Sequence, residues 1–432
     1  MVLGKHLKIV LAALLSTGFI CIQAEENVPV VKAKSKVISI RDGIHFRKNL
    51  WHLDPSVGLD TYYADLPLKP HHVTFITDVD SITFHIKPGN VYDFIILLNE
   101  KDSCHTRILA NLRGNTTYTR IAKDAGPDTL HFTMHQSRIY FKGKLNQYEG
   151  ALFQFDLGAG MSAVNHRSVS KAKIQFDANT ILVNSQGSNE ALVSKSTTIQ
   201  IGGLQWEKVS MVRTKNMDNY EDAIIGNFLF EDKIAEIDYD RKIMVLHDSL
   251  PPVTNDYSKH EVIYVQHRPF IRASIIEGGK VYTDWFLFDT GRDGNMVLRD
   301  SFFRKNYIWN QLKTVFLLGN KHVKVVPQLK IGEKIFTDII TPAYSPDKMH
   351  TDLPNILGNR LLCHFNVILD NHNGFIYLKP NNLNRIPYEN LSSFKRKAVM
   401  ILLGVSAVLS ISVFVFLRIR KKKRSSQKLS QE

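Results

Sequence analysis

The sequence repeats itself once across its central part, and this repeat constrains the fold more than any other feature. An Asp-x-Gly tripeptide follows an apolar run at Asp156 and again at Asp289. An apolar pair followed by Gly-Asn recurs at nearly the same spacing from each aspartate, at Gly226 and at Gly358. A further aspartate follows each glycine, again at matching spacing, and precedes a turn signal and another strand. Ile201-Gly202 and Ile331-Gly332, which lie between the first two of these landmarks, also match. Agreement at four landmarks predicts two homologous units.

The two units span residues 130–250 and 251–384, and both have the composition of β structure. Short runs of β-branched and aromatic residues, separated by glycine and proline, are typical of strands joined by turns. A break at Pro251-Pro252 separates the units. Residues 25–129 show the same strand signals without the repeat, and we expect a β-rich N-terminal domain of unknown role there. The sequence therefore predicts a mostly β protein.

The repeated pattern resembles the aspartic peptidases of the pepsin and retropepsin type. Asp289-Thr290-Gly291 ends an apolar strand, as the catalytic tripeptide does in that family, and the family's apolar-apolar-Gly segment has its match further along the chain, ending at Gly358. Within the family, the chain looks most like bacterial exported members that carry both lobes on one chain. The resemblance covers residues 130–384, more than half of the chain. It implies two homologous β-barrel lobes that hydrolyse bonds in a peptide or protein substrate.

The resemblance implies that Asp156 and Asp289 are the catalytic pair, and the chemistry of these residues agrees. A glycine two residues after each aspartate allows a sharp turn at the strand end, so the carboxyl group lies at the surface of its lobe. Two carboxyl groups ~3 Å apart share one proton, so one can accept a proton from water while the other polarises the scissile carbonyl. This reaction needs no cofactor, and no Cys/His cluster has the spacing of zinc ligands.

In the family, further residues hold the aspartates in place, and a hairpin flap closes over the substrate. The positions of this chain that match the supporting loops are Leu157, Gly158, Thr290, Gly291, Ile225, Gly226, Leu357 and Gly358. The flap candidates, from two segments with hairpin signals, are Gln186, Gly187, Gly319 and Asn320. Neither segment contains the tyrosine of pepsin flaps, so we expect a different grip on the substrate.

Two departures from the family's pattern bear on activity. The first tripeptide is Asp-Leu-Gly, and the Leu157 side chain cannot form the hydrogen bonds by which the family's threonine hydroxyls cross-link the two loops. The second tripeptide is followed by Arg292, which would favour ionised Asp289 if it pointed inward. We expect Arg292 to point to solvent.

The leading hypothesis is a membrane-anchored aspartic endopeptidase. Leu157 and Arg292 favour a first alternative, a catalytically inactive relative that keeps the cleft as a peptide-binding module. A second alternative is an envelope structural or adhesion protein in which the repeat is only a scaffold. The distance between Asp156 and Asp289 separates these alternatives in part, because a scaffold has no need to bring two carboxyl groups together.

Both ends of the chain carry targeting signals. The first 24 residues combine Lys5 and Lys8 with an apolar run and end in Ala24, which is typical of a cleavable signal peptide. Residues 398–417 contain no charge, and a helix of that length crosses a ~30 Å hydrocarbon core. We expect a juxtamembrane linker at 385–397 before this single membrane helix.

Positive charge is concentrated around and beyond the expected membrane helix. The basic tail, residues 418–432, should stay in the cytoplasm, which places the bulk of the chain in the periplasm or outside the cell. Residues 395–432 carry ten Lys/Arg and one Glu, and the first 24 residues carry two Lys, so only +3 of the formal net charge of +14 belongs to residues 25–394. This nearly neutral part gives no reason to expect nucleic acid as a partner.

Cysteine usage predicts no disulfide scaffold. Of three cysteines, Cys21 lies in the expected signal peptide, which leaves Cys104 and Cys363 far apart in the sequence. One bridge between them fits an exported protein.

Overall fold

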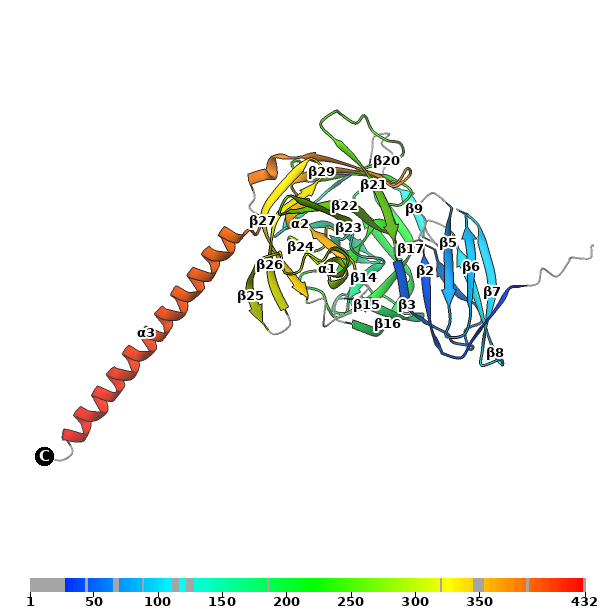
Figure 1. Ribbon diagram of the computed structural model, residues 1–432. Coiled ribbons are helices and arrows are strands. Elements are labelled where there is room, and N and C mark those ends of the chain that lie inside the picture. Colours follow the sequence, from blue (N-terminus) through cyan, green and yellow to red (C-terminus); the bar gives the residue numbers. More distant parts are fainter. Residues whose placement is uncertain are drawn as a thin grey trace, which may run out of the picture.

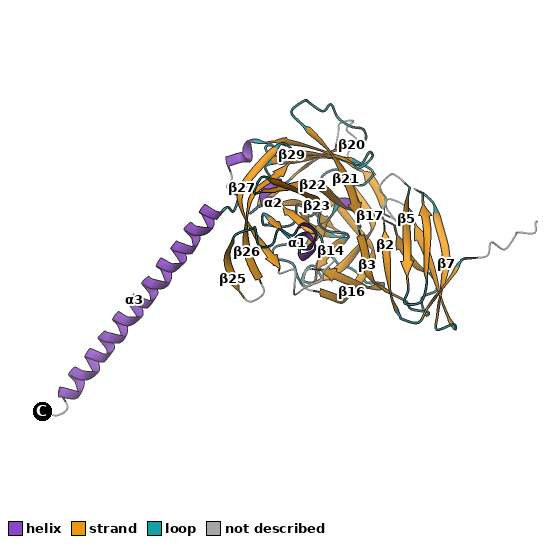
Figure 2. Ribbon diagram, in the orientation of Figure 1, coloured by secondary structure: helices purple, strands orange, loops and turns teal. Residues whose placement is uncertain are grey.

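The computed structural model describes residues 28–42, 46–64, 70–87, 89–110, 116–121, 128–184, 187–318, 321–344, 353–385 and 388–429. Strands dominate these ranges, and one long helix projects from the C-terminal side (Figures 1 and 2). The mostly β class predicted from the sequence is therefore confirmed. The predicted signal peptide, residues 1–24, lies outside the described residues.

The N-terminal part of the chain is a β-sandwich with a core of its own. Its strands, blue to cyan in Figure 1, are β1 (Val30–Ala33), β2 (Val37–Asp42), β3 (Phe46–His52), β4 (Asp60–Tyr63), β5 (His71–Ile76), β6 (Ser81–Ile86), β7 (Val91–Leu98) and β8 (Asp102–Leu109). One sheet has the order β1-β7-β8-β4 and the other β3-β2-β5-β6. Phe75 and Phe94 meet between the sheets with ring centroids 4.7 Å apart. This packing buries the inward-facing alternate residues of each strand.

The first lobe begins earlier than the sequence predicted. Strand β9 (Thr117–Arg120) falls in the range 25–129 that we assigned to the N-terminal domain, yet it pairs with β17 (Leu204–Thr214) of the first lobe. The Thr116 hydroxyl also donates a hydrogen bond to the Lys208 carbonyl. The turn signal at Gly126-Pro127 suggested a boundary there, but strand pairing over such a long stretch of chain leaves no local signal.

Lobe 1 places the strand that precedes Asp156 beside the apolar-apolar-Gly segment. Its other strands are β11 (Thr133–His135), β12 (Arg138–Leu145), β13 (Tyr148–Phe155), β14 (Ser162–Asn165), β15 (Ala178–Asn184), β16 (Gly187–Ile201) and β18 (Ala223–Ile225), and a short 3₁₀ helix, η1 (Asn227–Leu229), follows. β18 lies between β13, with which it pairs in parallel, and β14, with which it pairs antiparallel.

Lobe 2 repeats this arrangement. Its elements are β22 (Arg268–Glu277), β23 (Lys280–Asp289), β24 (Met296–Val297), α1 (Asp300–Asn306), β25 (Thr314–Leu318), β26 (Lys321–Ile331), β27 (Lys334–Tyr344), β28 (Asn355–Gly358) and α2 (Asn359–Leu362). β28 pairs in parallel with β23, which ends at Asp289, and antiparallel with β24. Matching topology at matching sequence positions identifies two homologous lobes, as the repeat predicted.

One sheet joins the two lobes. Its first strands, in spatial order, are β10 (Asp128–His131), β20 (Ile243–His247), β19 (Ile234–Asp238), β29 (Phe365–Asp370), β30 (Phe375–Pro380) and β21 (Ser258–Val265), and a 3₁₀ helix, η2 (Asn382–Arg385), follows β30. β21 also pairs with β22, through which the sheet continues into lobe 2. β19 and β29 pair antiparallel at the centre, with Ile237 opposite Val367. β19 with β20 and β29 with β30 are the hairpins predicted after the third landmark of each unit. This shared sheet fixes the two lobes relative to each other.

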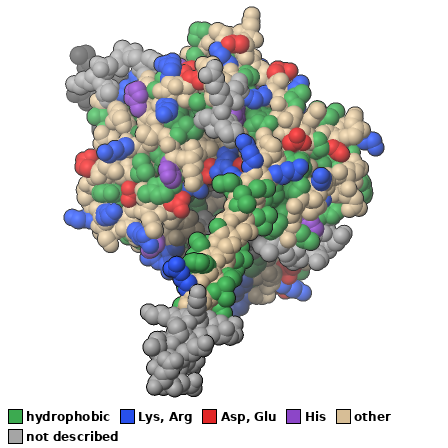
Figure 3. All heavy atoms as spheres, turned by 90° about the vertical axis from the view of Figure 1, so that its left-hand side faces the viewer, with side chains coloured by type: hydrophobic (Ala, Val, Ile, Leu, Met, Phe, Trp, Pro, Cys, Tyr) green, Lys and Arg blue, Asp and Glu red, His purple; other side chains and the backbone are tan. Residues whose placement is uncertain are grey.

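The C-terminal helix α3 (Leu391–Leu429) is longer than the predicted membrane helix at 398–417. It includes most of the predicted linker, 385–397, and runs into the predicted tail, 418–432, because basic residues are good helix formers and no proline interrupts them. Asn390 caps its start, since its side-chain oxygen accepts a hydrogen bond from the Ser393 backbone N–H at 2.9 Å. The stretch Leu391–Ile419 has a mean hydropathy of 2.7 in its most apolar window, none of it buried, and is apolar enough to cross a membrane (Figure 3).

Candidate active site

The fold brings Asp156 and Asp289 together where the two lobes meet. Asp156 directly follows β13, and Asp289 is the last residue of β23. Phe155 and Phe288, which precede them, are buried in the core, so each strand is anchored up to the residue before its aspartate. The two carboxyl groups hydrogen-bond to each other, and both residues are half-buried.

Backbone N–H groups of both loops point at the carboxyl pair. Asp156 Oδ1 accepts hydrogen bonds from the Gly158 N–H at 2.7 Å and from the Gly291 N–H, across the lobe boundary, at 3.2 Å. Asp289 accepts a hydrogen bond from the backbone of Arg292. A Cβ atom at position 158 would lie 2.6 Å from Asp289 Cγ, and one at 291 would lie 2.1 Å from Asp156 Cγ. Both glycines are therefore required by the close approach of the opposite carboxyl group.

The surroundings of the pair favour a shared proton. Burial raises the pKa of Asp289 well above its usual range, and the nearby charge of Asp156 raises it further. Burial also raises the pKa of Asp156, although the hydrogen bonds from Gly158 and Gly291 oppose this by stabilising its ionised form. The proton is consequently held more firmly on Asp289, and the negative charge more firmly on Asp156.

Thr290 forms half of the cross-link that the family's threonines provide. Its hydroxyl accepts a hydrogen bond from the Leu157 N–H at 2.9 Å and donates one to the Phe155 carbonyl at 3.1 Å. Thr290 and the Leu157 side chain are both fully buried. As predicted, the Leu157 side chain makes no hydrogen bond, but its backbone still takes part in the contact. The link between the loops is therefore retained from one side.

Gln154, which the sequence analysis did not single out, adds a second link between the lobes. Its side-chain N–H donates a hydrogen bond to the Gly291 carbonyl at 2.8 Å, and the side chain is buried. The Gly291 N–H in turn donates to Asp156, so Gln154 holds in place the residue of lobe 2 that contacts this carboxyl group. The signal in the sequence is a single polar residue in the apolar run Ala151–Phe155.

The repeated glycines of the apolar-apolar-Gly segments lie directly beneath the aspartate loops. The carbonyl of Ile225 accepts a hydrogen bond from the Asp156 N–H at 2.8 Å. A Cβ atom at Gly226 would lie 2.6 Å from the Ala159 carbonyl oxygen, and one at Gly358 would lie 2.2 Å from the Gly294 carbonyl oxygen. Leu357, like Ile225, is fully buried. These positions pack closely against the backbone of the loops.

Arg292 does not point to solvent, contrary to our expectation. Its side chain is half-buried and packs near Gly358, with its Cδ 3.2 Å from the place a Cβ of that glycine would take. Its buried Nε has no hydrogen-bond partner among the described residues. The Arg292 charge lowers the pKa of Asp289, which opposes the upward effect of burial.

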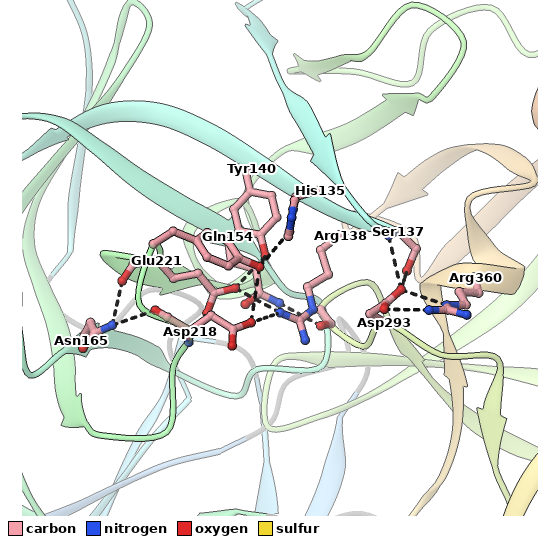
Figure 4. A network of polar contacts seen from close by, with 12 residues as sticks. His135, Ser137, Arg138, Tyr140, Gln154, Asn165, Asp218, Glu221, Asp293 and Arg360 are labelled. Atoms are coloured by element: carbon pink, nitrogen blue, oxygen red, sulfur yellow. Dashed lines mark hydrogen bonds and ion pairs between the residues drawn. The ribbon is translucent and has the colours of Figure 1, made fainter. Parts of the chain in front are cut away.

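Lobe 1 contains a polar network around Arg138 (Figure 4). Arg138 forms ion pairs with Asp218 at 2.8 Å and with Glu221 at 3.2 Å. The Tyr140 hydroxyl donates to Glu221 at 2.6 Å, and burial raises the pKa of this tyrosine. The positive charge of Arg138 lowers the pKa of Asp156, against the larger upward effect of burial. No local pattern signals this cluster, because its members come from distant parts of the sequence.

The two segments that contain the flap candidates include paired strands. β15 and β16 pair up to Asn184 and Gly187, the first residue of β16, and β25 pairs with β26. Gln186, Gly319 and Asn320 lie outside the described residues. Closure over a substrate stays a prediction.

Metal-binding groups and cysteines take no visible part in the site. Among the described residues, no group of three or more His, Cys, Asp or Glu side chains is arranged to hold a metal ion. Cys104 and Cys363 are both free and buried, in separate cores, so they do not form the single bridge that the sequence left open.

Comparisons with known proteins give a likeness to solved structures but no sequence match. No protein-family model matches the chain, and no curated protein sequence matches it. The chain is similar to the crystal structure of an aspartic proteinase from Irpex lacteus, with a TM-score of 0.42 and 12% sequence identity. The similarity covers 60% of this chain and 98% of that chain. We base the functional proposal on the geometry of the carboxyl pair.

Proposed function

We propose that the chain is an aspartic endopeptidase in which Asp156 and Asp289 activate water against a peptide bond. The observation that carries this proposal is the hydrogen-bonded contact of two half-buried carboxyl groups from two lobes, with a raised pKa at Asp289. Such pairs are costly to form in a scaffold, because two carboxyl groups repel when both are ionised. The contact between two carboxyl groups at equivalent strand ends therefore supports a catalytic role of the pair over a purely structural role.

The asymmetry of the pair suggests a role for each carboxyl group. Ionised Asp156, stabilised by two backbone N–H groups, accepts a proton from a water molecule bound between the two side chains. The resulting oxygen attacks the carbonyl carbon of the substrate, while protonated Asp289 donates its proton to the carbonyl oxygen. Collapse of the tetrahedral intermediate re-forms the C=O bond and breaks the C–N bond. The proton on Asp156 passes to the leaving amine, and one hydroxyl proton of the intermediate returns to Asp289.

The same geometry is compatible with one alternative function, peptide binding without cleavage. A relative without activity that binds peptides in the cleft is favoured by the missing hydroxyl at Leu157 and by the inward-facing cation of Arg292. Such a protein would bind peptides and release them uncut.

Cleavage of a mixed peptide library by the full-length protein in detergent tests the proposal. We expect cleavage at some pH between about 3 and 8, and its loss in Asp156→Asn and in Asp289→Asn, which keep the shape of the side chain and remove its charge. Asp177→Asn, an exposed aspartate of lobe 1, is the matched control and should cleave normally. Peptide binding without cleavage at any pH would support the inactive relative instead.

We further propose that α3 anchors the protein in a membrane, with the lobes in the periplasm or outside the cell and the basic end in the cytoplasm. The apolar stretch Leu391–Ile419 and the basic residues beyond it support this arrangement. In membrane vesicles whose outer face is the non-cytoplasmic face of the membrane, a protease added outside should digest the lobes and spare residues 420–432. Digestion of that tail alone would reverse the proposed topology.

A further inference from the structure

The three residues before the membrane helix pack against lobe 2. We call Tyr388–Asn390 the membrane-proximal segment. The Tyr388 hydroxyl accepts a hydrogen bond from the Thr337 N–H at 3.0 Å and donates one to the Thr337 carbonyl at 3.1 Å. The Tyr388 ring meets Phe336 edge to face, with centroids 5.2 Å apart. The segment is therefore docked on β27 and does not hang free between the lobe and the membrane helix.

The segment also holds the loop that carries Asp289. The side-chain amide of Asn295, at the end of this loop, donates to the Glu389 carbonyl at 2.6 Å and accepts from the Glu389 N–H at 3.2 Å. The same amide donates to the Ile340 carbonyl at 3.2 Å, and Asn295 is buried. The Asn295 carbonyl accepts a hydrogen bond from the Gly358 N–H at 2.6 Å. Asn295 thus ties the segment to the apolar-apolar-Gly support of the loop.

Side chains form a second connection from the segment to the loop. The Glu389 carboxylate pairs with Arg360 at 2.9 Å. Arg360 forms two hydrogen bonds with Asp293, at 2.9 and 3.0 Å, and Asp293 accepts a hydrogen bond from the Ser137 hydroxyl of lobe 1 at 2.8 Å (Figure 4). Arg360 and Ser137 lower the pKa of Asp293 to about 2, against the upward effect of burial, so this carboxylate remains ionised in the network. The chain of contacts runs from the segment through the loop and into the opposite lobe.

We infer that the membrane-proximal segment is a positioning element of the active-site loop 289–295, so that attachment to the membrane helix helps to set the geometry of Asp289. This inference rests on the proposed peptidase function. The segment leads into α3 without a spacer, because Asn390 caps the helix and Glu389 pairs with Lys397 in its second turn. Movement of the helix relative to lobe 2 would therefore act directly on Asn295 and Glu389.

Two substitutions in the full-length protein separate this role from general stability. Asn295→Ala removes the backbone link to the segment from the loop side. Tyr388→Ala loosens the segment at Thr337 and Phe336 without touching the loop. Asn381→Ala is the matched control, because its buried amide likewise donates two hydrogen bonds and accepts one. It donates to the Cys363 carbonyl and the Asn366 side-chain oxygen, and it accepts from the Leu383 N–H.

Hydrogen exchange at residues 289–295 measures how often the backbone of the loop opens. This measurement does not depend on whether the protein is an active peptidase. In detergent-solubilised protein we expect exchange there to rise about tenfold or more in Asn295→Ala and Tyr388→Ala, and to stay near wild type in Asn381→Ala. For cleavage, we expect kcat to fall about tenfold in both variants while KM changes about twofold or less, because a displaced Asp289 impairs the reaction more than binding.

Each outcome decides one of the two proposals. Unchanged exchange in Tyr388→Ala, with its secondary structure intact by circular dichroism, would overturn the positioning role even if wild-type protein is an active peptidase. If exchange rises in the two variants but the wild-type protein cleaves no peptide, the docking of the segment on the loop would be supported and the peptidase function refuted. Tyr388→Phe, which keeps the ring and loses the hydroxyl, should give an intermediate increase in exchange.

Discussion

The contacts between Asp156 and Asp289 depend on single side chains that reach across the lobe boundary. Thr290 bonds to the backbone on both sides of Asp156, and Gln154 bonds to the backbone beside Asp289. Leu157 has no hydroxyl that could form the matching contact from lobe 1. The Gln154 side chain instead donates a hydrogen bond from lobe 1 to the backbone of the Asp289 tripeptide. This pair of unlike contacts replaces the symmetric cross-link that the resemblance implied.

A double-mutant cycle tests whether Gln154 compensates for Leu157. Gln154→Leu leaves the Gly291 carbonyl without its donor, and we expect a loss of about 1–3 kcal/mol in stability and a fall in kcat/KM. In a Leu157→Thr background, where a threonine hydroxyl can restore the other link, the same substitution should cost less by about 1 kcal/mol. Gln205→Leu, a surface control, should leave kcat/KM unchanged. Strictly additive effects would show that the two positions act independently.

Arg292 should set the upper pH limit of cleavage. Asp289 must be protonated to act, so activity falls as the pH rises through its pKa, which burial raises and the Arg292 charge lowers. Removing that charge in Arg292→Gln raises the pKa of Asp289, and the alkaline limb of the kcat profile should move to higher pH. Arg272→Gln, which removes an exposed charge from β22, should not move it. A shift to lower pH in Arg292→Gln would contradict the inward position of the cation.

The sequence predicted the site residues that belong to a local motif. It did not predict the residues whose role comes from contacts with distant parts of the chain. Asp156 and Asp289 stand out because each follows an apolar strand and precedes a glycine. Gln154 contacts a residue in the other lobe, far along the chain, and the direction of Arg292 depends on how the loop returns over Gly358. No periodicity or spacing in the chain encodes those distances.

Strand pairing explains why the apolar-apolar-Gly segments matter at the scale of elements. β18 and β28 each lie between the strand before the aspartate and the strand that follows its loop. The loop must therefore pass close over the end of the central strand, where only a glycine fits. The repeat revealed this arrangement because two copies of one constraint left two copies of one pattern.

Gly358→Ala tests the support beneath the second loop. The added Cβ atom would lie 2.2 Å from the Gly294 carbonyl oxygen, which is backbone and cannot rotate away. We expect a loss of about 3 kcal/mol or more in the free energy of unfolding, measured by urea denaturation. Gly58→Ala, where nothing lies within 4 Å, is the control and should change it by about 0.5 kcal/mol or less. A stable Gly358→Ala protein would mean that the loop does not pass over β28 as described.

Helix and domain limits were predicted less well than the repeat. Hydropathy located the membrane helix but not its extent, because charged residues at 395–397 and beyond 417 continue the helix outside the apolar stretch. We predicted a linker at 385–397 and did not distinguish Tyr388–Asn390 within it. This segment docks on β27 through contacts with residues such as Thr337, which lie far earlier in the sequence. Boundaries set by long-range contacts leave only weak traces in composition.

The whole molecule joins three requirements in one chain: two lobes fixed by a shared sheet, a carboxyl pair at their contact, and a helix suited to a membrane next to lobe 2. The shared sheet keeps the lobes in register, with β19 against β29 at its centre. The membrane-proximal segment connects the helix to the loop of Asp289. A protein arranged in this way would act on peptides close to the membrane surface.

The central claim is that the two carboxyl groups work as one catalytic unit. The most direct test is kcat/KM of the full-length protein on its best library peptide, compared among wild type, Asp156→Asn, Asp289→Asn and the double variant. Because neither carboxyl group can hydrolyse the bond alone, each single substitution should reduce kcat/KM about as much as both together. Substantial activity in either single variant, or effects that add in the double variant, would contradict a shared dyad.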